Sequence, residues 1–234
     1  MRRESGILLP ITSLPSPYGI GCFSREAYEF IDYLKKAGQS YWQILPLGPT
    51  SYGDSPYQSF STFAGNPYFI SLEDLIEEGV LTREECAQAD PEVQEDSIDY
   101  AKLYEERYPL LRLAYERSDI SKNADFVRFC QENDWWLSDY ALFMAVKARF
   151  GGKAWTKWAQ DIRLRWGNAL DYYRRELYFD IEFHKYLQFT FFKQWSRLKA
   201  YANRQGIRII GDIPIYVAMD SADAWANPSL FQLD

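Results

Sequence analysis

Two short apolar runs separated by an amphipathic stretch constrain this chain more than any other feature. Residues 6–10 form the first run, which ends at a proline, and residues 41–46 form the second. Between them, apolar residues recur at helical spacing from Ala27 to Leu34, and Gly38 stands where a helix commonly ends. Strand, helix, strand is the pattern of a parallel crossover, so we expect a parallel sheet.

A third step of the same kind lies later in the sequence. Residues 182–203 have the pattern of a long amphipathic helix, and the apolar run 207–211 follows Gly206 at once. By pattern alone, three parallel strands joined by helices fit a doubly wound sheet or a TIM barrel equally well. A barrel needs eight such units, so a barrel parent would continue beyond this chain and leave a strand edge unpaired.

The residues between the second and third predicted strands do not show the strand–helix–strand pattern. Residues 51–71 are rich in glycine, proline, serine, asparagine and aromatics, without sustained periodicity, and long ordered loops are usually functional. Residues 72–175 show helical patterning and no strand pattern. We predict an α/β protein in three ranges, with 1–70 and 176–234 forming the sheet part and 71–175 a helical insertion subdomain.

The composition excludes several classes of protein. The chain has 234 residues, of which 47% are hydrophobic, enough for a large core without disulfides. Its cysteines, Cys22, Cys86 and Cys130, lack C-x-x-C spacing, so we expect reduced thiols in a cytoplasmic protein. The first apolar run is too short for a signal peptide or a membrane span. A net charge of −7 with mixed signs disfavours nucleic acid.

The chain also lacks the residues for several kinds of chemistry. His184 is the only histidine and falls within the helical pattern, so neither a histidine-based triad nor a multi-histidine metal site can form. Neither a P-loop nor a dinucleotide-binding glycine motif is present. We expect no metal, no cofactor and a structural role for His184.

The loop 52–68 combines groups that suit a binding site. It places Tyr52, Asp54 and Tyr57, together with several hydroxyl groups, on a segment stiffened by two prolines. Aromatic rings and polar donors on a stiff loop can bind a ligand without a large ordering cost. A rigid structural loop explains the same residues equally well.

Two further features have both a functional and a structural interpretation. Asp212 follows the apolar run 207–211 directly, where parallel strands open onto the ligand face of either architecture. A catalytic carboxylate and a carboxylate bonded to nearby loop amides are equally compatible with this position. The chain also has 8 Trp, 18 Tyr and 15 Phe, whose rings suit sugars but also suit an aromatic core. We interpret the pair Trp135 and Trp136 as core of the insertion.

Five segments match a known family of enzymes. They are residues 6–21, 42–50, 52–58, 135–143 and 211–218, and they include the runs Leu-Pro-Ile-Thr-Ser-Leu-Pro-Ser-Pro-Tyr-Gly and Gly-Asp-Ile-Pro-Ile-Tyr. On these segments the chain resembles, across essentially its whole length, the amylomaltase or disproportionating-enzyme family of 4-α-glucanotransferases. The resemblance implies a partial (β/α)8 TIM barrel, holding the first three β/α units, with a large helical insertion subdomain.

The resemblance also implies a reaction. The family transfers α-1,4-glucan segments to an acceptor glucan or glucose by a retaining double displacement, without metal or organic cofactor. Retention needs two carboxyl groups roughly 5–5.5 Å apart, and in the family both follow later strands, beyond Asp234. We therefore expect maltooligosaccharides, glycogen or starch as partners, no nucleic acid, no membrane and a missing C-terminal half. We also expect no activity from these residues alone.

We name six substrate-binding candidates, which are Tyr52, Asp54, Ser55, Tyr57, Tyr104 and Asp212. Asp54 comes from the make-up of the loop, and the resemblance implies the other five. Ser55 and Tyr57 look like residues that line the glucan subsites, with a stacking face on Tyr57. Asp212 resembles an acid that supports the catalytic centre without acting as nucleophile. Tyr52 and Tyr104 resemble a tyrosine pair that holds glucan away from the cleavage point.

Two alternatives remain open at this point. One is a non-catalytic glucan-binding remnant, which the aromatic loop and the absent carboxylate pair favour. The other is an α-glucan hydrolase of the same superfamily, because nothing in the residues distinguishes an acceptor sugar from water. A product assay separates a transferase from a hydrolase, since only the transferase makes longer oligosaccharides.

Overall fold

The computed structural model describes residues 3–50, 54–88 and 97–232, and these form two compact units. Unit 1 comprises Met1–Leu47, Asn66–Asp119 and Thr190–Ile213, whereas unit 2 comprises Gly48–Gly65, Ile120–Phe189 and Pro214–Asp234. Because the units interleave along the chain, they cut across the three predicted ranges. Those ranges stay a prediction.

Unit 1 contains a three-stranded parallel sheet. Its strands are β1 (Gly6–Leu8), β2 (Tyr41–Gln43) and β3 (Arg208–Ile210), in the order β1-β2-β3. Ile7 is in register with Trp42, and Trp42 with Ile209. The three predicted strands and their parallel direction are therefore confirmed.

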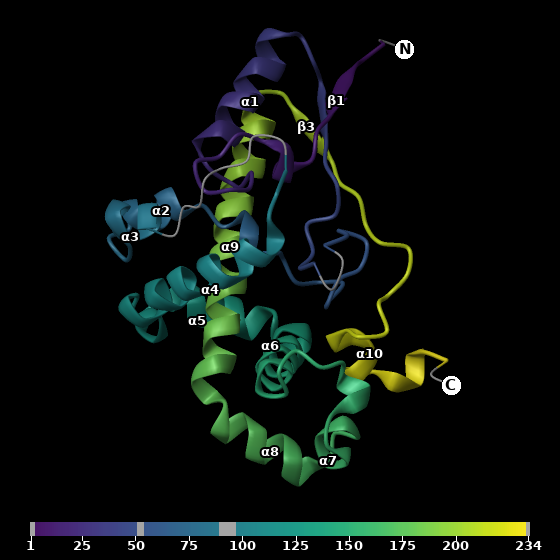
Figure 1. Ribbon diagram of the computed structural model, residues 1–234. Coiled ribbons are helices and arrows are strands. Elements are labelled where there is room, and N and C mark those ends of the chain that lie inside the picture. The colour runs from purple at the N-terminus through teal and green to yellow at the C-terminus, as the bar shows by residue number, and fades with distance from the viewer. Residues whose placement is uncertain (1–2, 51–53, 89–96, 233–234) are drawn as a thin grey trace. The chain divides into compact units, whose positions relative to one another are not determined.

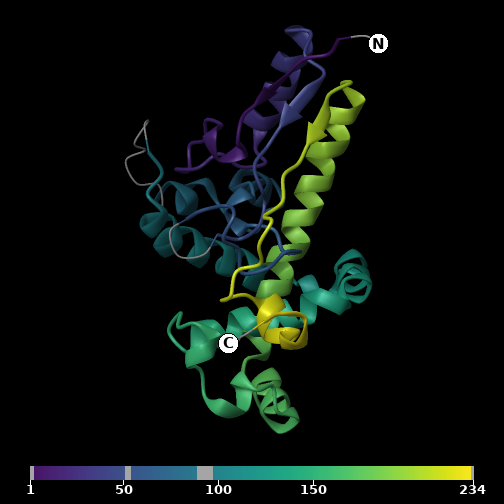
Figure 2. The same cartoon turned by 90° about the vertical axis from the view of Figure 1, so that its right-hand side faces the viewer.

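Helices connect these strands as the sequence pattern predicts. Helix α1 (Arg25–Lys36) joins β1 to β2, and the long helix α9 (Tyr178–Arg204) leads into β3. Figure 2 shows the strands side by side, with the C-terminal part of α9 running along them. Gly38 has a φ of +69°, a left-handed conformation that suits glycine and ends α1.

The sheet is covered by aromatic packing on one side. Trp42 is fully buried, its ring meets Phe30 edge-on at 5.1 Å, and its indole N–H donates to the carbonyl of Leu9 at 2.8 Å. Phe23 packs against the rings of Phe69, Phe191 and Trp195. This core fixes α9 against the sheet.

The remaining helices of unit 1 pack around a buried arginine. They are α2 (Leu72–Glu77), α3 (Arg83–Gln88) and α4 (Tyr100–Arg117), with short 3-10 turns at Ile11–Ser13 and Pro67–Phe69. Arg107 on α4 is 2% exposed, and its guanidinium donates to the carbonyls of Tyr18 at 3.0 Å and Ile70 at 3.4 Å. It thereby joins the loop after β1 to the segment before α2.

Unit 2 is helical (Figure 1). Its helices are α5 (Ala124–Glu132), α6 (Asp134–Arg149), α7 (Gln160–Arg163), α8 (Gly167–Glu176), the first part of α9 and α10 (Ala222–Ala226), with 3-10 turns at Ile120–Lys122, Trp155–Lys157 and Pro228–Leu230. At its centre, Phe143, Trp158 and Trp225 lie within 5.3–5.9 Å of one another, and all three are buried.

A buried ion pair adds to this core. Lys147 on α6 donates to a carboxylate oxygen of Asp220 at 2.5 Å, and its ammonium lies 4.9 Å from the centroid of the Phe60 ring. The other carboxylate oxygen of Asp220 accepts the backbone N–H of Trp155 at 3.2 Å. These contacts hold the segment before α10 to the helices of the same unit.

The described residues contain neither a membrane-spanning helix nor a cluster of metal-ligating side chains. None of the helices in the described ranges is long and apolar enough to cross a membrane. Among the same residues, no group of three or more His, Cys, Asp or Glu side chains could hold a metal ion.

Candidate functional site

The loop from Asp54 to Gly65, in unit 2, contains the densest set of candidate residues. Ser55 begins a tight turn, because its carbonyl accepts the N–H of Gln58 at 3.1 Å. Pro56 fits the second position of that turn, where its fixed φ is favoured. The hydroxyl of Ser55 accepts the N–H of Tyr57 at 3.3 Å, and the Tyr57 side chain is 45% exposed. The turn therefore presents a tyrosine ring to solvent.

Asp54 precedes this turn in an unusual backbone conformation. Its φ is +56°, in the left-handed region that few residues other than glycine adopt. Aspartate tolerates this region better than most side chains, although the conformation still costs on the order of 1 kcal/mol. The turn thus brings Asp54, Ser55 and Tyr57 together. Tyr52 lies outside the described residues.

The second half of the loop is pinned by hydrogen bonds. The side-chain amide of Gln188 bonds Gly65 in both directions, donating at 2.9 Å and accepting at 2.7 Å. The hydroxyl of Ser59 donates to the carbonyl of Ser61 at 2.8 Å, and Thr50 pairs with Ser59 in an isolated antiparallel bridge. A loop anchored at this many points holds its exposed side chains in place.

Asp212 lies in unit 1, two residues after β3. Its side chain is exposed, and one carboxylate oxygen accepts the backbone N–H of Ile213 at 2.9 Å. One of the two interpretations of Asp212, a carboxylate bonded to a nearby loop amide, therefore has a matching hydrogen bond in the structure.

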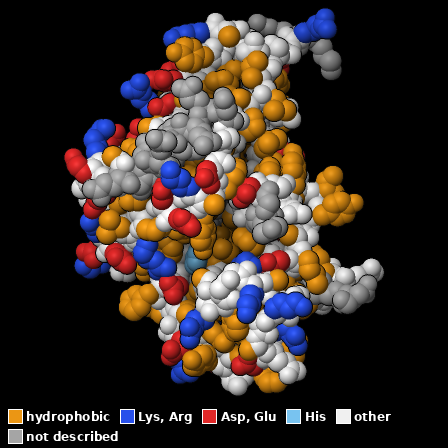
Figure 3. All heavy atoms as spheres, in the orientation of Figure 1, with side chains coloured by type: hydrophobic (Ala, Val, Ile, Leu, Met, Phe, Trp, Pro, Cys, Tyr) orange, Lys and Arg blue, Asp and Glu red, His pale blue; other side chains and the backbone are white. Residues whose placement is uncertain are grey.

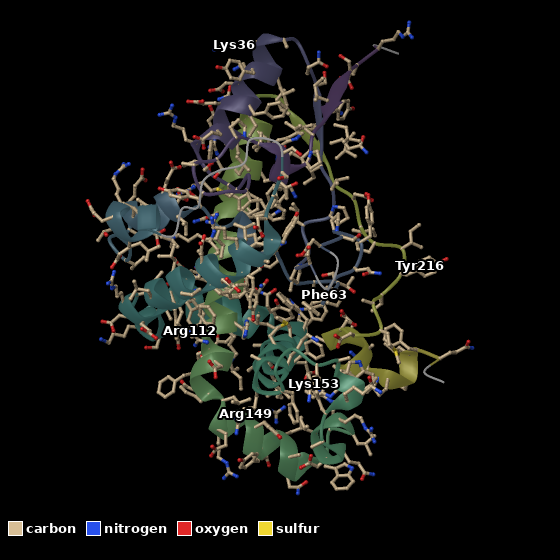
Figure 4. All side chains as sticks on the ribbon, in the orientation of Figure 1. Lys36, Phe63, Arg112, Arg149, Lys153 and Tyr216 are labelled. Atoms are coloured by element: carbon tan, nitrogen blue, oxygen red, sulfur yellow. The ribbon has the colours of Figure 1, made fainter. Side chains whose placement is uncertain are left out.

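The segment after Asp212 exposes large apolar side chains. Ile213 is 77% exposed, Ile215 90% and Tyr216 85%. Figure 3 shows hydrophobic side chains projecting along this segment, and Figure 4 shows Tyr216 pointing away from the ribbon. Exposed apolar runs of this length usually mark a contact surface.

Tyr104 also lies in unit 1, on α4. It is 63% exposed, and its ring packs against that of Tyr108 at 5.2 Å. The structure thus places Asp54, Ser55 and Tyr57 in one turn of unit 2, while Tyr104 and Asp212 belong to unit 1.

The cysteines and the histidine do not suggest a nucleophile. Burial raises the pKa of Cys22, and it raises the pKa of both Cys86 and Cys130 to about 11. Thiols with such pKa values stay protonated near neutral pH, and the protonated thiol is a poor nucleophile. His184 is 7% exposed and lies within α9, next to the ring of Phe183.

Sequence reasoning was partly wrong about the paired tryptophans. Trp136 is 7% exposed and belongs to the core, as expected, but Trp135 is 67% exposed. Successive residues of a helix point about 100° apart, so both rings could not face the same core. Sequence reasoning also missed Phe63, whose ring meets Trp135, and Asp223, whose carboxylate accepts the N–H of Thr62 at 2.8 Å. No sequence signal links residues 161 positions apart.

A comparison with family models gives the family. The model described as 4-alpha-glucanotransferase matches residues 9–234. The chain belongs to the 4-α-glucanotransferase family. Two curated relatives with that name come from Clostridium butyricum, 50% identical over 96% of this chain, and from Thermus thermophilus, 48% identical over 99%. In both cases this chain covers 46% of the relative.

Solved structures of this family agree with the fold. The amylomaltase from Streptococcus agalactiae in complex with acarbose is 45% identical, with a TM-score of 0.95 over 100% of this chain and 48% of that protein. The amylomaltase from Corynebacterium glutamicum matches with a TM-score of 0.74 over 97% of this chain and 32% of its own, and at 24% identity it supports the fold alone. The chain spans about half the length of the curated relatives it matches.

Proposed function

We propose that these residues are the glucan-binding N-terminal half of a 4-α-glucanotransferase. The parent would transfer α-1,4-glucan segments, such as those of maltooligosaccharides, glycogen or starch, to an acceptor glucan or glucose. The observation that carries the proposal is the match of the whole chain to an amylomaltase, with a TM-score of 0.95. That relative was solved in complex with acarbose.

The sheet fits the start of a larger barrel. Three parallel strands in the order β1-β2-β3, joined by helices, are the arrangement of the first three units of a (β/α)8 barrel. In a barrel the active site lies at the carboxyl ends of the strands. Asp212 follows β3 at that end, and we assign it a supporting role at the catalytic centre.

The parent reaction would be a retaining double displacement. One carboxylate attacks the anomeric carbon, and a second protonates the leaving sugar and later deprotonates the acceptor hydroxyl, with the two carboxyls roughly 5–5.5 Å apart. We place both in the part of the relatives that this chain does not span. The residues present here would bind and orient the glucan.

The exposed turn supports the binding role. Tyr57 offers a ring for an apolar sugar face, and Asp54 and Ser55 offer oxygens for sugar hydroxyls. We assign Tyr52 and Tyr104 to a second contact that holds glucan away from the cleavage point. The three cysteines are free, which fits a reducing compartment such as the cytoplasm.

A fusion protein tests this proposal. Residues 1–234 are joined to the C-terminal half of the Streptococcus agalactiae amylomaltase, and the fusion is incubated with maltotriose beside the chain alone. We expect the fusion to make glucose and a ladder of longer maltodextrins, and the chain alone to make neither. Tyr57→Ala in the fusion should weaken turnover about tenfold, while Tyr57→Phe, which keeps the ring, should lose much less.

The product pattern separates the alternatives. Glucose without longer products would favour the hydrolase. A fusion that folds and binds maltoheptaose but turns nothing over would favour the non-catalytic remnant. A ladder made by the chain alone would contradict the assignment of the nucleophile and the acid/base to the other half.

A further inference from the structure

Trp135 and Phe63 form an exposed aromatic corner in unit 2. Trp135 is 67% exposed and Phe63 is 44% exposed, and their ring centroids lie 4.6 Å apart. The ring planes meet at 73°, so one ring stands edge-on to the other. Figure 4 labels Phe63 on the loop that passes α6, the helix whose first turn carries Trp135. The corner therefore exposes parts of two aromatic rings that meet at a steep angle.

The helix side of the corner is fixed from beneath. The ring of Trp136 lies 6.3 Å from that of Phe63, and it is itself buried. The indole N–H of Trp136 donates to the side-chain oxygen of Asn133 at 3.1 Å, and the Asn133 amide donates to the carbonyl of Phe129 at 2.8 Å. This partly buried chain of contacts sets the direction in which α6 begins, and with it the position of Trp135.

The loop side of the corner is fixed as well. The buried hydroxyl of Ser61 accepts the backbone N–H groups of Phe63 at 3.1 Å and Ala64 at 3.2 Å. The N–H of Thr62 donates to the carboxylate of Asp223 at 2.8 Å. Because Phe63 is held from both sides in sequence, the corner is preorganised, and binding there would cost little ordering entropy.

Polar residues flank the two rings in the sequence. Asp134 precedes Trp135 and Thr62 precedes Phe63, both are exposed, and one carboxylate oxygen of Asp134 accepts the hydroxyl of Ser138 at 2.5 Å. A carboxylate and a hydroxyl accept hydrogen bonds from hydroxyl groups, whereas the negative charge of Asp134 repels phosphate. Two rings also supply far less than the about 800 Å² per partner that a standard protein interface buries. A single pyranose fits this corner better than a protein surface or a nucleic acid does.

We propose that the aromatic corner binds one glucose unit of an α-1,4-glucan, with an apolar sugar face against the indole of Trp135. The identity of the sugar rests on the proposed function, but the corner shares no residue with the turn that presents Tyr57. A polymer held at two points dissociates more slowly than one held at either. The corner would therefore favour long glucans over short ones.

Indole NMR signals test the corner directly. Each of the 8 tryptophans gives one indole signal, and Trp135→Phe identifies that of Trp135. When maltoheptaose is titrated into the chain, we expect a saturable shift of this signal. Trp135→Ala should weaken binding at the corner, followed through the amide signals of Thr62 and Phe63, about tenfold, because one sugar face removes roughly 50 Å² of apolar surface from water. Trp135→Tyr should restore most of the affinity.

A matched control lies in the same unit. Trp166 is 47% exposed, and among the described residues its ring packs against no other aromatic ring. Trp166→Ala should leave the Trp135 shift unchanged.

Two results would overturn the proposal. One is a Trp135 signal that does not shift in either the chain or the fusion, although the fusion turns over maltotriose. That result would contradict sugar binding at the aromatic corner and leave the proposed function intact. The other is a Trp135 indole that acrylamide cannot quench in the fusion, because protein would then cover the corner. A saturable Trp135 shift in a fusion that turns nothing over would support the corner while the proposed transferase fails.

Discussion

The outer strands of the sheet in unit 1, β1 and β3, and the helical core of unit 2 bury their apolar residues to different extents. All three residues of β1 are exposed, with Leu8 at 56%, and Ile210 on β3 is 42% exposed. In unit 2, Phe143, Trp158 and Trp225 are at most 3% exposed. The helical unit therefore closes its core with its own residues. The strands of unit 1 keep apolar surface that nothing in the described ranges covers.

Trp225→Ala should have the largest effect on stability. The Trp225 ring packs against Phe143 and Trp158, and its indole N–H donates to the carbonyl of Ile162 at 3.1 Å. Removing a buried tryptophan leaves a cavity and costs about 3–5 kcal/mol. Urea unfolding of the chain measures this cost.

The exposed Trp166 supplies the control for that measurement. Trp166→Ala should change the free energy of unfolding by less than about 0.5 kcal/mol, because the residue is half exposed. Equal losses for both variants would contradict the view that unit 2 closes its own core.

Breaking the ion pair of unit 2 should cause the second-largest loss of stability. Asp220→Asn leaves the Lys147 ammonium, whose side chain is 9% exposed, without its charged partner. We expect a loss of about 2–3 kcal/mol, below the usual cost of breaking a buried pair because the side chain of Asp220 keeps 32% exposure. Adding Lys147→Met to Asp220→Asn should recover at least half of this loss, measured by urea unfolding. The single variant Lys147→Met completes the comparison. If the double variant lost as much free energy of unfolding as the two single variants together, the two side chains would not interact.

The sequence predicted most of the fold and only part of the site. Strands, α1 and α9 were predictable because their signal is local: an apolar run or a 3.6-residue period lies within one segment. The bonds from Thr62 to Asp223 and from Lys147 to Asp220 join distant segments, and no local pattern encodes them.

Trp135 shows why candidate sites are harder to predict than folds. Its aromatic character suits both a core and a binding surface, and only the direction of α6 decides between them. The roles of Ser55, Tyr57, Tyr104 and Asp212 came from the resemblance to a family and stay predictions.

A polar substitution on β1 tests whether the other half of a longer protein covers the strands of unit 1. Leu8→Ser in the chain alone should change the free energy of unfolding by less than about 0.5 kcal/mol, because the side chain is already exposed. In the fusion with the C-terminal half of an amylomaltase, we expect a loss of about 2 kcal/mol, since Leu8 would then be buried. Urea unfolding of both proteins gives the comparison. The same small loss in both would mean that the added half does not cover the strands.

Acid should act in opposite directions through one carboxyl of each unit, Glu85 and Asp223, with the smallest effect of this set. In unit 1, the bidentate hydrogen bonds from Arg117, at 2.8 Å and 2.9 Å, lower the pKa of the Glu85 carboxyl to about 2. Because this pKa is below its ordinary value of 4.5, Glu85 stabilises unit 1 above pH 4.5, and that stability is lost as the pH falls toward 2.

In unit 2, burial raises the pKa of Asp223 above 3.8 despite the bond from Thr62. The folded state of unit 2 therefore holds that proton more tightly than the unfolded state does, so unit 2 gains stability as the pH falls through this pKa toward 3.8.

Carboxyl carbon NMR shifts between pH 2 and 6 measure both groups, and two variants separate their causes. Arg117→Gln should return the pKa of Glu85 toward 4.5, because its hydrogen-bond partner is the main cause of the shift. Asp223→Asn keeps an oxygen that accepts the Thr62 N–H but cannot titrate, so it should remove the acid-induced gain of unit 2 without breaking that contact. If both carboxyls titrated near their ordinary values, the contrast between the ion pair of Glu85 in unit 1 and the half-buried Asp223 in unit 2 would be wrong. If Asp223 alone titrated near its ordinary value, water would reach its carboxylate. The contact between Asp223 and Thr62, which supports the loop side of the aromatic corner, would then be more open to solvent than the structure indicates.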